Sequence, residues 1–218
     1  MIQFLDNYQP WLKDHTFTVP KNTILEMPIH IKLSENIQYH FHVESNCNLT
    51  LIVEFEPLSN HQNQVDLSLD IQPNSHIKYV LISEEKITKI AINQTVNVSE
   101  DANVHVISGF LSQTLDVDLK VNLKGQNARA MVNAIAVSND QQQQTIDVHL
   151  THYAPYSYGD MYNVGISNGY GRVTLNGVEK IEKGMKQANA FQTLKGIILS
   201  DFSMVDVNPI LLIDEYDV

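Results

Sequence analysis

Apolar and polar residues alternate with a period of two along most of the chain. The clearest runs lie at residues 65–71 and 115–123, and shorter ones at 104–106 and 146–150. Because successive side chains of a β-strand point to opposite faces, each run predicts a strand with one buried and one solvated face. Helical spacing is confined to the first dozen residues, in a short amphipathic pattern made by Phe4, Leu5, Tyr8 and Trp11.

Turn-forming residues separate these strands at short, fairly regular intervals, and two Asn-Gly pairs favour hairpins locally. We therefore expect one all-β body over residues 24–218, preceded by an N-terminal lead at 1–23 with a possible short helix. A β-sandwich and a parallel β-helix both fit this pattern, and periodicity does not choose between them. The expected turns lie at Pro73-Asn74, Glu100-Asp101, Gly125-Gln126-Asn127, Asn139-Asp140, Asn168-Gly169 and Asn176-Gly177.

Composition narrows the class of protein. The 218 residues suit a single domain, and 43% hydrophobic content is enough to fill a core. The net charge of −11 argues against nucleic acid and against an anionic membrane surface as partners. No apolar run approaches the ~20 residues that span a bilayer, and the first residues show no signal-peptide pattern. We expect a cytoplasmic protein.

The last third of the chain contains an extended series of distinctive segments. Two of them are His152-Tyr-Ala-Pro155 and Gly171-Arg-Val-Thr-Leu-Asn-Gly177. The segments that follow are Asn176-Gly-Val-Glu-Lys-Ile-Glu-Lys-Gly184, Ala188-Asn-Ala-Phe-Gln-Thr193, Ile197-Ile-Leu-Ser-Asp201 and Val205-Asp-Val-Asn-Pro209-Ile-Leu-Leu-Ile-Asp214. In content and order, this series resembles the core of the SufB/SufD family of iron–sulfur cluster assembly scaffold proteins.

This resemblance implies a right-handed parallel β-helix and a non-catalytic scaffold role, with SufB-like and SufC-like assembly proteins as partners. SufB-type chains carry a functional cysteine near the strand that corresponds to residues 192–196, which here read Gln-Thr-Leu-Lys-Gly. The resemblance is therefore to SufD rather than to SufB. The helical segments that flank the family core, one of which docks the ATPase, are not recognisable, so we expect SufC docking to be weak.

The resemblance also places the pairing of SufB with SufD near the C-terminal end of the core. The matching stretch of this chain is strongly apolar, and we expect it to form a homodimer when no partner is present. The candidate subunit-interface residues are Ile197, Leu199, Ile210, Leu211 and Ile213.

Metal ligands and thiols are sparse. His40 and His42 are two apart on a strand, so both imidazoles face the same side, but no third ligand is visible in the sequence and a surface pair is the simpler interpretation. Cys47 has no basic neighbour in sequence to activate it, so we expect an inert thiol. Iron–sulfur clusters are usually held by four thiolates. We therefore expect no metal or cofactor on the isolated chain, and a cluster only transiently with a partner.

Two further functions compete with the scaffold hypothesis. The acidic pairs Asp66/Asp70 and Asp116/Asp118 on polar strand faces would suit a carbohydrate-active β-helix enzyme, although solvated faces explain them more simply. A β-sandwich binding module is the other. No nucleophile elbow, zinc-protease motif or other catalytic motif is present, so we expect no catalytic residues.

Overall fold

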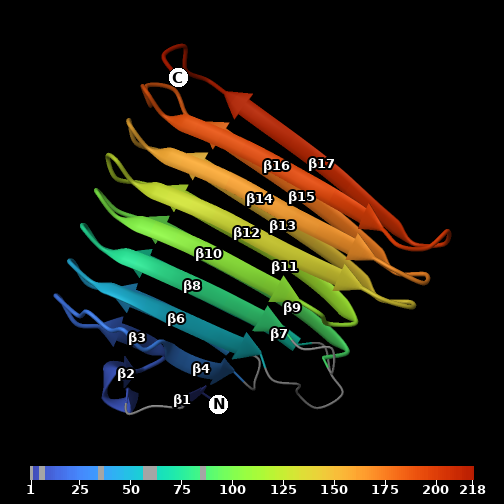
Figure 1. The fold of residues 1–218 in the computed structure, drawn as a ribbon. Helices are drawn as coiled ribbons and strands as arrows, with labels where there is room; N and C mark the ends of the chain where they lie inside the picture. The colour runs from blue at the N-terminus through green and yellow to red at the C-terminus, as the bar shows by residue number, and fades with distance from the viewer. Residues whose placement is uncertain (1, 5–7, 34–36, 56–62, 84–86) are drawn as a thin grey trace.

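The computed structural model describes residues 2–4, 8–33, 37–55, 63–83 and 87–218. The chain passes alternately between two sheets and stacks its strands in sequence order from one end of the molecule to the other (Figure 1). The first sheet contains β1 (Ile2–Phe4), β4 (Ile29–Leu33), β6 (Asn48–Phe55), β8 (His76–Ser83), β10 (Asn103–Phe110), β12 (Arg129–Ser138), β14 (Tyr158–Ser167) and β16 (Asn189–Ile198). The second contains β2 (Leu12–Lys13), β3 (Thr16–Val19), β5 (Ile37–Val43), β7 (Asn63–Ile71), β9 (Lys89–Val98), β11 (Thr114–Leu123), β13 (Gln143–His152), β15 (Arg172–Ile181) and β17 (Met204–Ile213).

Strands within each sheet pair in parallel, apart from β1 with β4 and β2 with β3. Paired residues in neighbouring coils are between 22 residues apart, as for Ile29 and Leu51, and 32 apart, as for Arg172 and Met204. This arrangement is a parallel β-solenoid, which confirms the architecture expected from the family resemblance. It also shows that the β-sandwich alternative is wrong.

Alternate residues of each strand fill the space between the two sheets. In β11 and β13 every second position is buried, so the strands predicted at 115–123 and 146–150 are confirmed, as are those at 65–71 and 104–106. The apolar residues of all coils join into one continuous core. Each coil buries its inner side chains against the coils before and after it, which is the stabilising interaction of a solenoid.

One corner of the solenoid has the same backbone geometry in coil after coil. A residue with positive φ stands at this corner, and its backbone N–H donates to the corner of the next coil. Asn and Asp tolerate this left-handed conformation better than other non-glycine residues, which explains their repetition. The corner residues are Asn22, Asn46, Asn74, Asp101, Asn127, Tyr156 and Gln187.

One predicted turn is wrong. Asn176 and Gly177 lie inside β15, where Gly177 is paired in parallel with Val148 and Pro209. A Cβ atom at Gly177 would meet the side chains of Gln192 and Met161. The glycine therefore serves close packing inside the solenoid, and the expected local preference for a hairpin does not apply. The other five predicted turns lie between strands.

The expected N-terminal lead contains a short 3-10 helix, Gln9–Trp11, and strand β3, which already pairs with β5. Leu5, part of the amphipathic pattern, lies outside the described residues. Tyr8, Trp11 and Leu12 pack against the core at this end. No helix among the described residues has the length and apolar character needed to cross a bilayer.

The turn between β11 and β12 provides a test of coil stacking. A Cβ atom at Gly125 would run into the backbone of Glu100 and Ser99 in the preceding coil. Backbone atoms cannot rotate away as a side chain can, so we expect Gly125→Ala to destabilise the fold by roughly 1–3 kcal/mol in urea unfolding. Gly109→Ala in β10 is the matched control, because a Cβ there meets nothing within 4 Å. Equal unfolding midpoints for the two variants would contradict this packing.

Candidate functional site at the C-terminal end of the solenoid

The two ends of the solenoid differ. At the N-terminal end, Tyr8 and Trp11 cover the first coil, with their ring centroids 4.9 Å apart. At the opposite end, β16 and β17 are the outermost strands of their sheets (Figure 1). Their inward-facing positions, fully buried in the coils before them, are partly or largely exposed here. This end therefore presents the interior of the solenoid to solvent.

The exposed surface at this end is apolar. Leu211 and Ile213 pair with Glu179 and Ile181, both buried, so they point inward and yet remain 48% and 47% exposed. The predicted interface residues thus occupy three parts of the end. Leu211 and Ile213 line the open interior, Ile210 and Ile197 lie on the outer faces of β17 and β16, and Leu199 follows β16.

Exposed aromatic residues, which sequence reasoning missed, extend this surface. The rings of Tyr170 and Phe202 stack with their centroids 5.2 Å apart, and both side chains are more than half exposed. Phe191 on β16 is 52% exposed and contacts Tyr158. Single aromatic residues next to turns carry no periodic signal, so only the fold reveals that they gather at one end.

A buried polar pair lies just inside this end. His152 and Glu179 are both fully buried, and His152 Nε2 lies 3.3 Å from Glu179 Oε1. Ser157 Oγ donates to the Ala154 carbonyl oxygen, so His152 Nδ1, at 2.8 Å, donates to Ser157 Oγ. One proton is then shared between His152 Nε2 and the Glu179 carboxyl. Burial raises the pKa of Glu179, and the hydrogen bond from His152 opposes that rise in part.

His149, three residues before His152 on β13, is partly exposed, whereas His152 is buried. Sequence reasoning did not pair His152 with Glu179, because the two are 27 residues apart and meet only through the register of β13 and β15. Gly159 leaves room for them, since a Cβ there would meet both side chains. The pair is enclosed and hydrogen-bonded. Neither side chain lines one of the grooves found among the described residues.

Cys47 is 1% exposed, and its Sγ lies 3.2 Å from the Pro20 carbonyl oxygen. It follows the left-handed corner residue Asn46, a place that other coils fill with small buried residues such as Ser75 and Ala102. Its position is that of a small core residue. A thiol enclosed in this way does not offer a ligand to a metal at the surface.

Asp66, Asp70 and Asp118 of the acidic pairs are engaged within the fold. Asn93 and Asn97 donate to Asp66 and Asp70 across neighbouring coils, at 2.6 and 2.7 Å. Lys120 donates to Asp118 within β11 at 2.6 Å. Asp66 and Asp70 therefore take part in hydrogen bonds between coils on the outer face of one sheet. Among the grooves found on the described residues, none is lined by side chains from both acidic pairs, Asp66/Asp70 and Asp116/Asp118.

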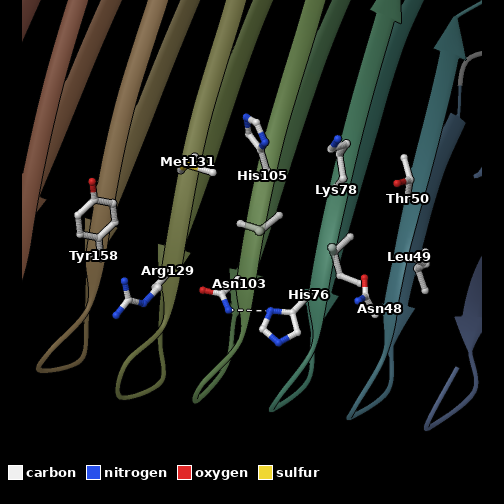
Figure 2. Close-up of a pocket in the computed structure, with 12 residues that line it drawn as sticks. Asn48, Leu49, Thr50, His76, Lys78, Asn103, His105, Arg129, Met131 and Tyr158 are labelled. Atoms are coloured by element: carbon white, nitrogen blue, oxygen red, sulfur yellow. Dashed lines mark hydrogen bonds between the residues drawn. The ribbon is translucent and has the colours of Figure 1, made fainter. Parts of the chain in front are cut away.

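A shallow groove of about 560 Å³ crosses the outer face of the other sheet, from β6 to β14 (Figure 2). Lys78 and Arg129 project into it, and Arg129 lies 5.8 Å from the centre of the Tyr158 ring. Asn103 Nδ2 donates to His76 Nδ1 at 2.8 Å, which fixes that imidazole. The lining includes cationic side chains and no carboxylate, so it suits an anionic group. Sequence reasoning missed the groove because its residues come from five coils.

The family model of the SUF system FeS cluster assembly SufBD core domain matches residues 34–218, which is most of the chain and most of the solenoid. The chain therefore belongs to the SufB/SufD family. The open apolar end formed by β16 and β17 lies within the matched region.

Among curated proteins, the chain is similar to the iron–sulfur cluster assembly protein SufD of Bacillus subtilis. The two are 33% identical over 97 residues, which cover 44% of this chain and 22% of the relative. The aligned part thus spans less than a quarter of that protein's length.

The buried pair predicts how stability depends on pH. Since the folded-state pKa of Glu179 is raised, the folded chain keeps a proton that the unfolded chain releases above its ordinary pKa of about 4.3. Stability should therefore fall as pH rises from that value through the folded-state pKa. We expect Glu179→Gln to remove this fall and to be more stable than wild type at neutral pH, measured as urea midpoints across pH.

Glu182→Gln is the control, because Glu182 is partly exposed and paired with Lys180 at 2.7 Å. It should keep the wild-type pH slope. A Glu179→Gln variant that is less stable than wild type at neutral pH would show that the ionised pair stabilises the fold.

Proposed function

We propose that this protein is a non-catalytic, SufD-like scaffold subunit of iron–sulfur cluster assembly that pairs with a SufB-like chain through the open end of its solenoid. The single observation that carries this proposal is the exposed apolar surface on β16 and β17. In the preceding coils, the inward-facing apolar side chains of the described residues are buried in one continuous core. A scaffold needs a surface for its partner rather than an enclosed reaction site. The membership of the SufB/SufD family supports the same role.

The energetics of the open end favour association. Each aliphatic side chain that becomes fully buried contributes ~1.5–3 kcal/mol. The acidic groups nearby oppose pairing weakly, since exposed charge effects are ~1 kcal/mol or less and are screened by salt. Two of these acids are also engaged within the chain. Asp214 lies 3.7 Å from Lys180 Nζ, and Glu215 Oε2 accepts from the Gly184 backbone N–H.

We propose that the same surface forms a homodimer when no partner is present, with the end of one copy packed on the end of a second around a two-fold axis. Binding of a SufC-like ATPase by this core alone is proposed to be weak. The described residues include no α-helix that could act as the docking segment expected from the family resemblance.

Replacing inward-facing aliphatic residues by lysine tests the pairing surface. Leu211→Lys with Ile213→Lys places two charges at the open end, so we expect the dimer to become a monomer in light scattering. The double variant should also lose co-purification with a SufB-like partner. Ile24→Lys is the control, since Ile24 is 74% exposed but lies between β3 and β4 at the other end. A wild-type chain that stays monomeric at high micromolar concentration and does not bind a SufB-like chain would contradict the proposal.

We further propose that the isolated chain retains no iron–sulfur cluster and that a cluster, as the cargo of assembly, resides on it only together with a partner. Cys47 is the chain's one cysteine and is buried, whereas clusters are usually held by four thiolates. Anaerobic reconstitution, followed by iron and sulfide assay, should find no stoichiometric cluster. A retained cluster that survives Cys47→Ser would show that other side chains provide the ligands.

A further inference from the structure

The described residues bring three metal-ligand side chains together at one place on the outer face of the solenoid. Ligand atoms of His40, His42 and Asp70 all lie within 4.8 Å of one another. His40 Nε2 is 3.6 Å from Asp70 Oδ2, and the two imidazole rings have their centroids 6.0 Å apart. Two imidazoles and one carboxylate form a ligand set that zinc and ferrous iron use in proteins, with further positions open to water.

Strand register supplies the ligand that the sequence did not show. His40 and His42 face one side of β5 because they are two residues apart. In the next coil, Asp70 of β7 pairs with His42, and Ser68 pairs with His40. Asp70 is 28 residues beyond His42, so the carboxylate becomes visible only when one coil is placed on the next.

Neighbouring side chains hold two of these ligands in place. His40 Nδ1 lies 2.7 Å from Ser68 Oγ, so when Nε2 binds a metal, Nδ1 carries the ring proton and donates to that hydroxyl. Asp70 Oδ1 accepts from Asn97 Nδ2 at 2.7 Å, and Asn97 Oδ1 accepts from Asn122 Nδ2 at 2.9 Å. Asp70 Oδ2 is the oxygen that faces His40. Such outer hydrogen bonds orient metal ligands and tune their affinity.

The spacing requires only a small adjustment of the side chains. Zinc–nitrogen and zinc–oxygen bonds of about 2.0–2.2 Å in tetrahedral geometry place ligand atoms roughly 3.3–3.5 Å apart. The separation of 3.6 Å between His40 Nε2 and Asp70 Oδ2 is close to this already. The side chains of His40, His42 and Asp70 are 35%, 27% and 33% exposed, so rotation can bring all three onto one ion.

The charge around the cluster favours a cation. Glu44 Oε1 lies 3.4 Å from His42 Nε2 and adds a second carboxylate beside that histidine. Neutral threonines, Thr16 and Thr18, face the two histidines from β3. Two lysines share the row that contains His40. Lys13 on β2 lies two strands away, or roughly 10 Å, and Lys120 on β11 lies three strands away, or roughly 14 Å, where it is already paired with Asp118.

We propose that His40, His42 and Asp70 form an exchangeable binding site for one divalent transition-metal ion of the zinc or ferrous type. Imidazole ligands disfavour Mg²⁺ and Ca²⁺, which prefer oxygen. This site replaces the interpretation of His40 and His42 as a surface pair and the expectation of no metal on the isolated chain. It is independent of the proposed pairing surface, since β5 and β7 lie several coils from β16 and β17.

The test is titration of the untagged full chain, freed of metal by a chelator, with Co²⁺ followed by its visible ligand-field bands, and then competition by Zn²⁺. One equivalent should bind. His42→Gln and Asp70→Asn should abolish saturable binding, and Asp70→Asn keeps an oxygen that can accept from Asn97. Ser68→Ala should weaken binding roughly 10–100-fold. His149→Gln is the control, because His149 lies on the outer face of the same sheet but outside the cluster.

Circular dichroism and urea unfolding of each variant establish that the solenoid is intact. Three results would overturn the proposal: no saturable Co²⁺ binding to the folded wild-type chain, equal binding by Asp70→Asn and wild type, or competition by Mg²⁺ as effective as by Zn²⁺. Light scattering of the metal-free and metal-loaded chain separates this site from the open end. An unchanged dimer in both states is the expected result, and a dimer that forms only with metal would contradict the independence of the two sites.

Discussion

In-register parallel stacking of coils is the constraint on which the rest of the structure depends. Each strand hydrogen-bonds with the equivalent strands of the coils before and after it, so a side chain that points inward in one coil lies beside an inward side chain in the next. This turns weak local alternation into a continuous apolar core. It also aligns outward polar residues in rows, as in the series Asp70, Asn97 and Asn122 on one face.

The same constraint makes the two ends of the solenoid different from its interior. A strand inside the stack has two neighbours in its sheet, whereas β16 and β17 each have one. At the N-terminal end, a turn containing Trp11 and the antiparallel strands β1 and β2 cover the first coil. The inner residues of the last coil are left exposed, although the sequence places aliphatic side chains there as it does inside. An apolar inner face that reaches solvent is a surface for a partner.

How much could be predicted from the sequence depends on how local each signal is. The alternation of apolar and polar residues correctly predicted strands such as 115–123, because this pattern can be recognised within a single strand. It did not choose the solenoid, which came from the family resemblance. The turn predicted at Asn176-Gly177 was wrong because a local preference lost to packing between coils. His40 and His42 were predicted to share one face of a strand, but Asp70 was not recognised as a third ligand beside them. The pairing of His152 with Glu179 was not predicted either. Both depend on register between coils.

The central claim, that the open end receives the partner, is tested most directly by site-specific photo-crosslinking. A photoreactive residue is placed at Leu211 on the open end or at Ile24 at the other end, and each chain is irradiated with a SufB-like core. The account predicts a crosslink from position 211, mapped by mass spectrometry to the end strands of the partner, and none from position 24. A crosslink from position 24 with none from position 211 would contradict it.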